Sequence, residues 1–124
     1  MVGVVLVSHS AGLAEEAVAL ARGIAGERVP IVAAGGTEDG GLGASVDLIE
    51  RAVRDADQGD GVVLIPDLGS SVLTARLLEV PGRIVLADVP FVEGAVSAAV
   101  ASGGGLPLAG VLAAAEEARG HRKL

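Results

Sequence analysis

The run VGVVLV at residues 2–7, followed at once by SHS at residues 8–10, is an apolar stretch that ends abruptly in polar residues. Its hydrophobicity is continuous rather than alternating, which favours a strand that is buried on both faces. Such strands are typical of parallel sheets that are covered by helices on both sides. His9, one of only two histidines in the chain, would then lie at the carboxyl end of a buried strand.

The rest of the sequence alternates short Val, Ile and Leu runs with longer helical patterns. After Val2–Val7, we predict strands at Val29–Ala34, Val62–Ile65 and Arg83–Ala87. The predicted helices are Ala11–Ile24, Ala44–Ala56, Ser70–Glu79, Val92–Ser102 and Leu108–Arg119. Pro30 favours an edge position for the second strand because proline removes a ladder donor. Since each connection is long enough for a helical crossover, the pattern predicts an α/β three-layer sandwich with a central four-stranded parallel sheet.

Length and composition narrow the possible partners. The chain has 124 residues, which favours a single domain over residues 1–124. Phe91 is the only aromatic residue, so side chains that would stack on single-stranded nucleic acid are missing. Nine basic and 16 acidic residues give a net charge of −7, which disfavours nucleic acid and suits a basic protein partner. The absence of cysteine excludes disulfides, thiol catalysis and thiolate metal sites.

One segment, residues 94–115, carries no charge and is long enough to span a membrane. It consists mostly of Ala, Gly and Ser, and GGG at residues 103–105 with Pro107 interrupts it in the middle. We therefore predict two buried helices around a turn and no membrane span. The amino terminus lacks a basic region before its apolar run, so we expect no signal peptide and a cytoplasmic location.

The polar residues that follow the predicted strands should meet at one edge of the sheet. Ligands of an open parallel sheet bind at the carboxyl ends of the strands, where the strand order reverses. If the strand order is 2-1-3-4, the reversal lies between the first and third strands, and His9 and Asp67 would then face each other. A carboxylate that accepts a hydrogen bond from one imidazole nitrogen leaves the other nitrogen unprotonated and nucleophilic.

Hydroxyl and glycine residues around this pair suit a phosphate group. Two adjacent serines open the helix after the third predicted strand, where free N–H groups and the helix dipole favour an anion. The glycine before them would let the backbone approach closely. The residues predicted to bind phosphate are Ser10, Thr37, Gly69, Ser70 and Ser71. This pattern fits a histidine that carries a phosphoryl group, while the alternative is that DLGSS at residues 67–71 is an ordinary turn with a helix cap.

The sequence lacks the motifs of nucleotide binding, metal binding and serine hydrolysis. The loop GGTEDGG at residues 35–41 has neither the lysine and spacing of a P-loop nor the dinucleotide-binding pattern GxGxxG. No cluster of His, Asp and Glu has metal-ligand spacing, and the G-x-S-x-G nucleophile elbow is missing. We therefore expect neither a metal ion nor a cofactor.

A resemblance to a known family rests on five motifs in order: VSHS at 7–10, AGGT at 34–37, LGAS at 42–45, DLGSS at 67–71 and PFVEGAV at 90–96. Together they resemble the phosphotransferase subunit of the phosphoenolpyruvate-dependent dihydroxyacetone kinase. That subunit belongs with the mannose-type enzyme IIA domains of the sugar phosphotransferase system. The similarity extends to about residue 118 and implies a sheet of order 2-1-3-4. It also implies a phosphoryl carrier at His9 and an aspartate at Asp67 that orients the imidazole.

The same resemblance implies partners. The histidine phosphocarrier protein would donate a phosphoryl group to His9, and phospho-His9 would pass it to ADP on the kinase subunit. The family is usually dimeric, and the apolar segments Phe91–Val100 and Leu106–Ala114 would form the interface of a homodimer. Some members carry fused phosphocarrier and enzyme I-like domains after this one. Because the sequence ends at Leu124, phosphate is expected from separate proteins.

Two other functions fit the same residues. A mannose-family enzyme IIA component of sugar transport would pass its phosphate to a IIB partner. A regulatory binding module would control a partner through its phosphorylation state, without onward transfer. The acceptor of the phosphate would distinguish the three functions.

Overall fold

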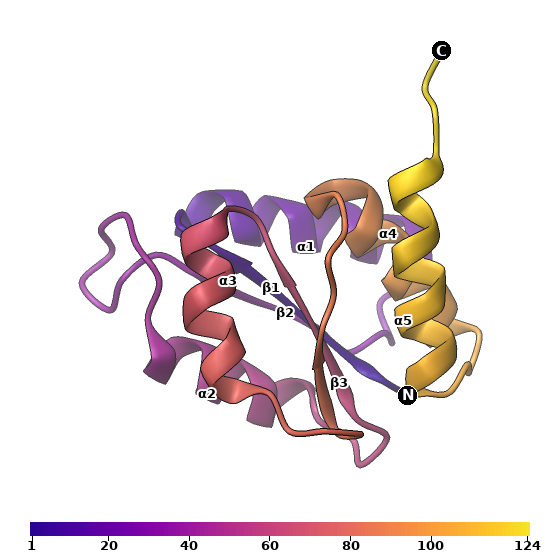
Figure 1. Ribbon diagram of the computed structural model, residues 1–124, viewed down its shortest axis with the longest axis horizontal. Coiled ribbons are helices and arrows are strands. Elements are labelled where there is room, and N and C mark those ends of the chain that lie inside the picture. The colour runs from indigo at the N-terminus through magenta and orange to yellow at the C-terminus, as the bar shows by residue number, and fades with distance from the viewer.

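The computed structural model describes residues 1–124 and has the predicted α/β architecture (Figure 1). Its strands are β1 (Gly3–Ser8), β2 (Ile31–Gly35), β3 (Val62–Pro66) and β4 (Ile84–Leu86). They form one parallel sheet of order β2-β1-β3-β4, which confirms the predicted order and the edge position of β2. The helices are α1 (Ala11–Ala25), α2 (Val46–Ala56), α3 (Gly69–Ala75), α4 (Phe91–Gly103) and α5 (Leu108–Glu117), with 3₁₀ helices η1 (Arg76–Leu78) and η2 (Ala118–Gly120).

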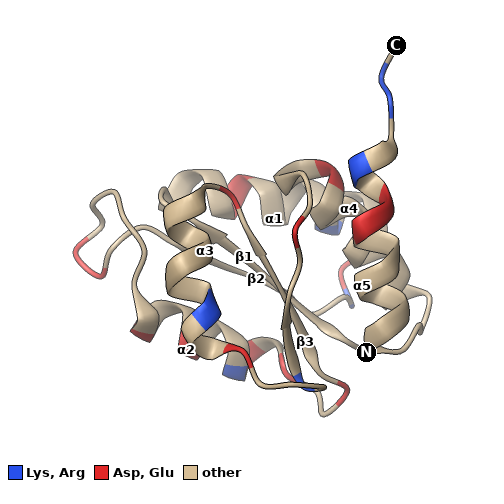
Figure 2. Ribbon diagram, in the orientation of Figure 1, with Lys and Arg blue, Asp and Glu red and all other residues tan.

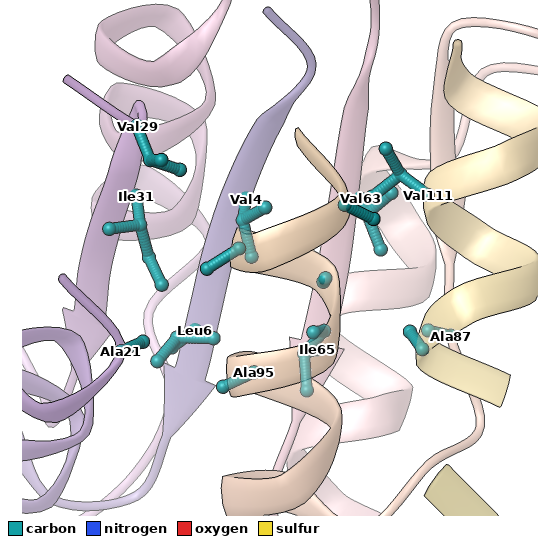
Figure 3. Close-up of a cluster of buried hydrophobic side chains, with 14 of the residues drawn as sticks. Val4, Leu6, Ala21, Val29, Ile31, Val63, Ile65, Ala87, Ala95 and Val111 are labelled. Atoms are coloured by element: carbon teal, nitrogen blue, oxygen red, sulfur yellow. The ribbon is translucent and has the colours of Figure 1, made fainter. Parts of the chain in front are cut away.

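The two faces of the sheet contact two separate cores. Side chains alternate between the faces along a strand, so Val4 and Leu6 of β1 join one core, and Val5 and Val7 join the other. Helices α1, α4 and α5 cover the first face, whose core is drawn in Figure 3, and α2 and α3 cover the second (Figure 1). Every residue of β1 and β3 is buried, which explains why both strands have continuous apolar sequences.

Most element boundaries differ from the prediction by one or a few residues, and two of these differences have clear local reasons. Helix α2 begins after Ser45 and not at Ala44, because the extended Ser45 caps it and its hydroxyl accepts the Leu48 N–H at 3.2 Å. Strand β2 begins later than Val29, because the Val29 carbonyl accepts the Ile31 N–H at 2.9 Å in a tight turn. In both cases a hydrogen bond of the connecting segment sets the boundary.

The uncharged segment at residues 94–115 forms most of α4, a turn and most of α5, which confirms the two predicted helices. Gly105 has a φ of 83° and follows α4 closely. Leu106 then donates its N–H to the Ala101 carbonyl at 3.2 Å, and Gly105 donates to Ser102 at 2.9 Å, the pattern of a Schellman helix end. None of the helices combines the length and apolar character that crossing a membrane requires.

Close packing of β2 against α1 fixes the chain beside His9. Gly35 is the last residue of β2, and a Cβ atom there would meet the Ala11 Cα at 2.8 Å and the Ala14 Cβ at 2.9 Å. Only glycine leaves room for this approach. The start of α1 is therefore held directly against the end of β2, and His9 lies two residues before that helix.

Candidate active site

His9 and Asp67 lie together where the strand order reverses. His9 follows β1 and Asp67 follows β3, and Val7 pairs with Pro66 at the ends of these neighbouring strands. The imidazole Nδ1 lies 3.5 Å from Asp67 Oδ1. The His9 side chain is 24% exposed and that of Asp67 only 9%. The histidine is thus accessible to a partner, while the carboxylate is nearly enclosed.

The Asp67 carboxylate accepts four hydrogen bonds besides its contact with the imidazole. The Ser8 hydroxyl (2.7 Å) and the His9 N–H (3.2 Å) donate to Oδ2, and the Leu68 N–H (2.7 Å) and the Ser71 hydroxyl (2.7 Å) donate to Oδ1. Burial by itself raises the pKa of this carboxyl, but the four hydrogen bonds outweigh it and lower the pKa from 3.8 to about 2. The group is therefore ionised at neutral pH and can only accept hydrogen bonds.

This lowered pKa makes the stability of the protein depend on acid. The folded state binds the Asp67 proton more weakly than the unfolded state, so its contribution is complete above the unfolded pKa of 3.8 and is lost as pH falls towards about 2. A shift of this size corresponds to about 2 kcal/mol. Urea unfolding of wild type and Asp67→Asn from pH 7 to pH 2 should show a difference that shrinks below pH 4. A difference that stays constant over this range would contradict the assignment.

The imidazole Nδ1 has a shorter contact with Ser71 than with Asp67. Its fully buried Oγ lies 2.8 Å from His9 Nδ1 and 2.7 Å from Asp67 Oδ1. A serine hydroxyl has a single hydrogen, and the ionised carboxylate requires it as a donor. The Ser71 oxygen must then accept the Nδ1–H of the imidazole. This hydrogen-bond accounting assigns the imidazole proton to Nδ1 and leaves a lone pair on Nε2.

The other imidazole nitrogen has a different environment. The Ser70 hydroxyl lies 2.6 Å from Nε2 and, because Nε2 carries the lone pair, Ser70 is the donor. Ser70 is exposed, so its hydroxyl is free to rotate when another group approaches. Nδ1 is therefore held from inside the protein, while Nε2 is covered only by an exposed hydroxyl.

Two further residues of the predicted phosphate site lie at helix starts. The Ser10 hydroxyl caps α1 and accepts the Leu13 N–H at 3.2 Å, which leaves its own hydrogen available. Gly69 is the first residue of α3, and a Cβ atom there would meet nothing within 4 Å. Neither packing nor a positive φ requires glycine at position 69.

Thr37 is oriented within its own loop. Its hydroxyl donates to the Asp39 carboxylate and accepts the Gly41 N–H at 2.9 Å, and no hydrogen bond joins it to His9. The loop still contacts the histidine, because Gly43 donates its N–H to the His9 carbonyl at 3.0 Å. A phosphate contact by Thr37 stays a prediction.

Ser8 is a site residue that sequence reasoning missed. It is fully buried, donates to Asp67 and accepts the Ser10 N–H at 3.0 Å, so it supports both the carboxylate and the chain after His9. The available signal was a hydroxyl at the end of a buried strand, since a buried polar group needs a partner.

The largest pocket lies next to this site but does not include the histidine. It measures about 490 Å³, begins at Asp67 and Gly69, and extends between α3 and the segment after β4. No group of three or more His, Cys, Asp or Glu side chains is arranged to hold a metal ion.

Comparisons with known proteins show which family the chain resembles. The family model EIIA-man, described as PTS system fructose IIA component, matches residues 3–109. The phosphoryl donor subunit DhaM of PEP-dependent dihydroxyacetone kinase 2 of Listeria innocua serovar 6a is 32% identical over 108 residues, which are 82% of this chain and 86% of the relative. The corresponding subunit of kinase 1 of the same organism is 36% identical over 99 residues, 78% of each chain.

A solved structure has the same fold. The crystal structure of unknown function protein EF1359 superposes with a TM-score of 0.81 at 29% identity, and the alignment covers 100% of this chain and 99% of that chain. Since the family model spans most of the residues and the Listeria relatives align over most of their length, the chain belongs to the EIIA-man family, the mannose-type enzyme IIA domains of the phosphotransferase system.

Proposed function

We propose that the chain is the phosphohistidine carrier of a phosphoenolpyruvate-dependent dihydroxyacetone kinase and that His9 carries the phosphoryl group on Nε2. The observation that carries this proposal is the asymmetry of the imidazole, in which buried Ser71 holds Nδ1 and only exposed Ser70 covers Nε2. The names of the Listeria relatives, which are phosphoryl donor subunits, support this choice of kinase. The proposal places the chain in the cytoplasm as one domain.

The proposed relay has two steps. First, the Nε2 lone pair attacks the phosphorus of a phosphorylated histidine on the histidine phosphocarrier protein, and the phosphorus–nitrogen bond of the donor breaks. No proton has to leave His9, because Nε2 carries none. The imidazole ring becomes positively charged, and the Asp67 carboxylate stabilises that charge. Second, a β-phosphate oxygen of ADP on the kinase subunit attacks the phosphorus, the bond to Nε2 breaks, and ATP forms.

We propose that the phosphoryl group is received at the starts of α1 and α3. The Ser70 hydroxyl is already next to Nε2 and has only to rotate to donate to a phosphate oxygen. The first N–H groups of a helix lack intrahelical acceptors, and the open space at Gly69 lets a phosphate approach the backbone. Ser10 offers its free hydroxyl hydrogen. Ser71, although expected from the sequence to bind phosphate, is proposed to hold the imidazole, because both of its hydrogen-bond partners lie inside the protein.

The Ser71→Ala variant tests this role. Loss of the hydroxyl leaves Nδ1 with only the 3.5 Å contact to Asp67, so the Nδ1–H tautomer should lose preference. We expect phosphoryl transfer to slow about tenfold, the value of one hydrogen bond. Nitrogen NMR of His9 should show the change of tautomer. Thr74→Ala is the control, because its hydroxyl lies on the same helix but contacts only the Ser70 carbonyl. An unchanged tautomer in Ser71→Ala would contradict the role.

We also propose that the chain forms a homodimer through α4 and α5. Val92, Val100 and Leu106 on this side remain 40%, 50% and 45% exposed in the single chain, which leaves apolar surface for a second copy. Light scattering at micromolar concentration should give twice the mass of the chain. A monomer under these conditions would rule out this interface.

A second candidate has the same chemistry at His9 and a different acceptor. The matching family model is described as a PTS system fructose IIA component. This description favours a sugar-transport enzyme IIA that passes its phosphate to a IIB protein.

Reconstitution distinguishes the candidates. Labelled phosphoenolpyruvate, enzyme I and the phosphocarrier protein would load the chain, which is then purified and mixed either with kinase subunits and ADP or with a IIB protein. We expect label in ATP only in the first mixture. Transfer to IIB alone would identify the transport function. A labelled chain that transfers to neither acceptor would support a regulatory module.

A further inference from the structure

The structure contains three fully buried polar residues, and all three are serines: Ser8, Ser71 and Ser102. A buried hydroxyl is costly unless it is hydrogen-bonded, so its partners show what each serine holds in place. Ser71 contacts the imidazole of His9. Ser102 of α4 donates to the Val2 carbonyl at 2.5 Å, which attaches α4 to the chain just before β1. Ser8 has both of its partners in the active site but makes no hydrogen bond to the imidazole.

The ionised Asp67 determines the direction of both hydrogen bonds of Ser8. The carboxylate can only accept, so the single hydrogen of the Ser8 hydroxyl points to Oδ2 at 2.7 Å. The Ser8 oxygen then accepts the Ser10 N–H at 3.0 Å. One hydroxyl thus joins the carboxylate that follows β3 to the residue that caps α1.

The orientation of the Asp67 carboxylate depends on hydrogen bonds. No cation holds this group, because residues 66–73 contain no Lys or Arg and its only ion pair is the 3.5 Å contact with His9. Figure 2 likewise shows no blue on the segment between β3 and α3. The χ2 torsion of an aspartate has a broad energy minimum, so donors at both oxygens are needed to fix the plane of the carboxylate.

Ser8 makes the shorter of the two hydrogen bonds to Oδ2 of Asp67. Its hydroxyl lies at 2.7 Å, whereas the His9 N–H lies at 3.2 Å. The two donors to Oδ1, Leu68 and Ser71, belong to the other side of the site, after β3. Without the Ser8 hydroxyl, the longer hydrogen bond from His9 would be the only one left at Oδ2.

The second hydrogen bond of Ser8 holds the start of α1. Ser10 is the N-cap of this helix, and its hydroxyl accepts the Leu13 N–H at 3.2 Å while its own hydrogen stays free. Since the Ser10 N–H donates to Ser8, the start of the helix is connected to the Asp67 carboxylate through a single hydroxyl.

We propose that Ser8 is a positioning residue for phosphoryl transfer, which holds the Asp67 carboxylate in the plane that orients the His9 imidazole and holds the start of α1 beside it. The attacking nitrogen and the hydroxyl of Ser10 then keep a fixed relative position, and a small misplacement of reacting groups lowers the rate strongly. The proposal rests on the phosphoryl carrier function of His9 and adds a residue that never touches the phosphoryl group.

The Ser8→Ala variant tests this role by its rate. We expect phosphoryl transfer to His9 to slow about tenfold, the value of one hydrogen bond. The loss should be the same with the phosphocarrier protein and with phosphoramidate, a small phosphoryl donor, because buried Ser8 cannot touch a partner protein. Ser8→Thr keeps the hydroxyl and should restore most of the rate. Ser102→Ala is the matched control, because it removes another fully buried hydroxyl that holds the chain at β1 and should leave the rate unchanged.

Two NMR measurements separate positioning from a general loss of stability. The hydrogen bond from Ser8 is one of those that lower the pKa of Asp67 to about 2. In Ser8→Ala this pKa should therefore rise, and in Ser8→Thr it should return. Exchange of the Ser10 N–H with solvent should become faster in Ser8→Ala, because that group loses its acceptor. Ser102→Ala should change neither the pKa nor the exchange rate.

A double-mutant cycle shows whether Ser8 acts through Asp67. In an Asp67→Asn background, Ser8→Ala should slow transfer much less than tenfold, because the carboxylate that Ser8 positions is gone. Ser8→Cys keeps the size of the side chain and donates only weakly, so it should show the same losses as Ser8→Ala and replaces that variant if it does not fold.

Three results would overturn the role of Ser8. They are a wild-type rate in folded Ser8→Ala, an equal slowing by Ser8→Ala with and without the Asp67 carboxylate, and equal losses in Ser8→Ala and Ser102→Ala. Circular dichroism at the assay temperature shows which variants are folded. If wild type accepted phosphate from neither donor, the carrier function of His9 would fail first, and the role of Ser8 would fail with it.

Discussion

Replacing His9 by alanine is expected to abolish phosphoryl labelling of the protein. The proposed bond forms at Nε2, and no neighbouring nucleophile has the same combination of a lone pair, exposure and an opposing carboxylate. The variant should still fold, because the backbone hydrogen bonds of residue 9 do not need the side chain. The His9 N–H donates to Asp67, and the His9 carbonyl accepts the Gly43 N–H. The label on wild type should be labile in acid and stable in base, as expected of a phosphorus–nitrogen bond.

The second histidine is the control for this experiment. His121 lies in the exposed C-terminal segment, and none of the side-chain hydrogen bonds of the structure involves its ring. His121→Ala should therefore be labelled as fast as wild type. Full labelling of His9→Ala would remove His9 from the proposed relay. Circular dichroism and thermal unfolding should show that both variants remain folded.

Asp67→Asn is expected to produce the second-largest loss of activity. The carboxylate accepts two hydrogen bonds at each oxygen, from Leu68 and Ser71 at Oδ1 and from Ser8 and His9 at Oδ2. An asparagine amide has one oxygen and one NH₂ group, so at least two of these donors would face another donor.

An NH₂ group facing Ser71 would release the Ser71 hydroxyl to donate to Nδ1, and this would stabilise the wrong tautomer of His9. By comparison with general acid–base systems, we expect phosphoryl transfer to slow by about 10²- to 10⁴-fold. The unpaired buried donors should also lower the free energy of unfolding by about 1–3 kcal/mol. Single-turnover kinetics below the unfolding temperature separate the two effects. If the folded variant transferred phosphate at the wild-type rate, Asp67 would have only a structural role in the turn after β3.

The sequence predicted the fold because each level of its pattern points to the same architecture. The runs at β1 and β3 are continuously apolar, which favours a parallel sheet covered on both faces, and Pro30 before β2 marks an edge. Given the order 2-1-3-4, which the family resemblance implied, the meeting of His9 and Asp67 followed from topology, since parallel strands present their carboxyl ends at one edge.

The hydrogen-bond network of the site was not predictable in the same way. The sequence places Ser71 at the start of a helix, where a phosphate contact is the natural expectation. Its actual partners depend on the direction of its side chain, which the turn at Leu68 and the first turn of α3 decide. Ser8 was missed because a hydroxyl at the end of a strand also occurs at ordinary surface positions. Hydrophobic periodicity shows which face of a helix or strand is buried. It does not show which rotamer a serine adopts or to which group its hydroxyl donates.

The fixed position of His9 affects how its partners can bind in the proposed relay. The histidine follows a strand whose every residue is buried, and Gly35 holds the next helix in place on the other side. The backbone at His9 is therefore fixed, and the histidine cannot move between two binding sites. In the proposed relay, the donor and the acceptor must bind at the same place one after the other. The overall rate of the proposed relay would then depend on the concentrations of the donor and acceptor proteins and on how long each complex lasts. A partner that dissociates slowly would block the next delivery, even if the chemical step were fast.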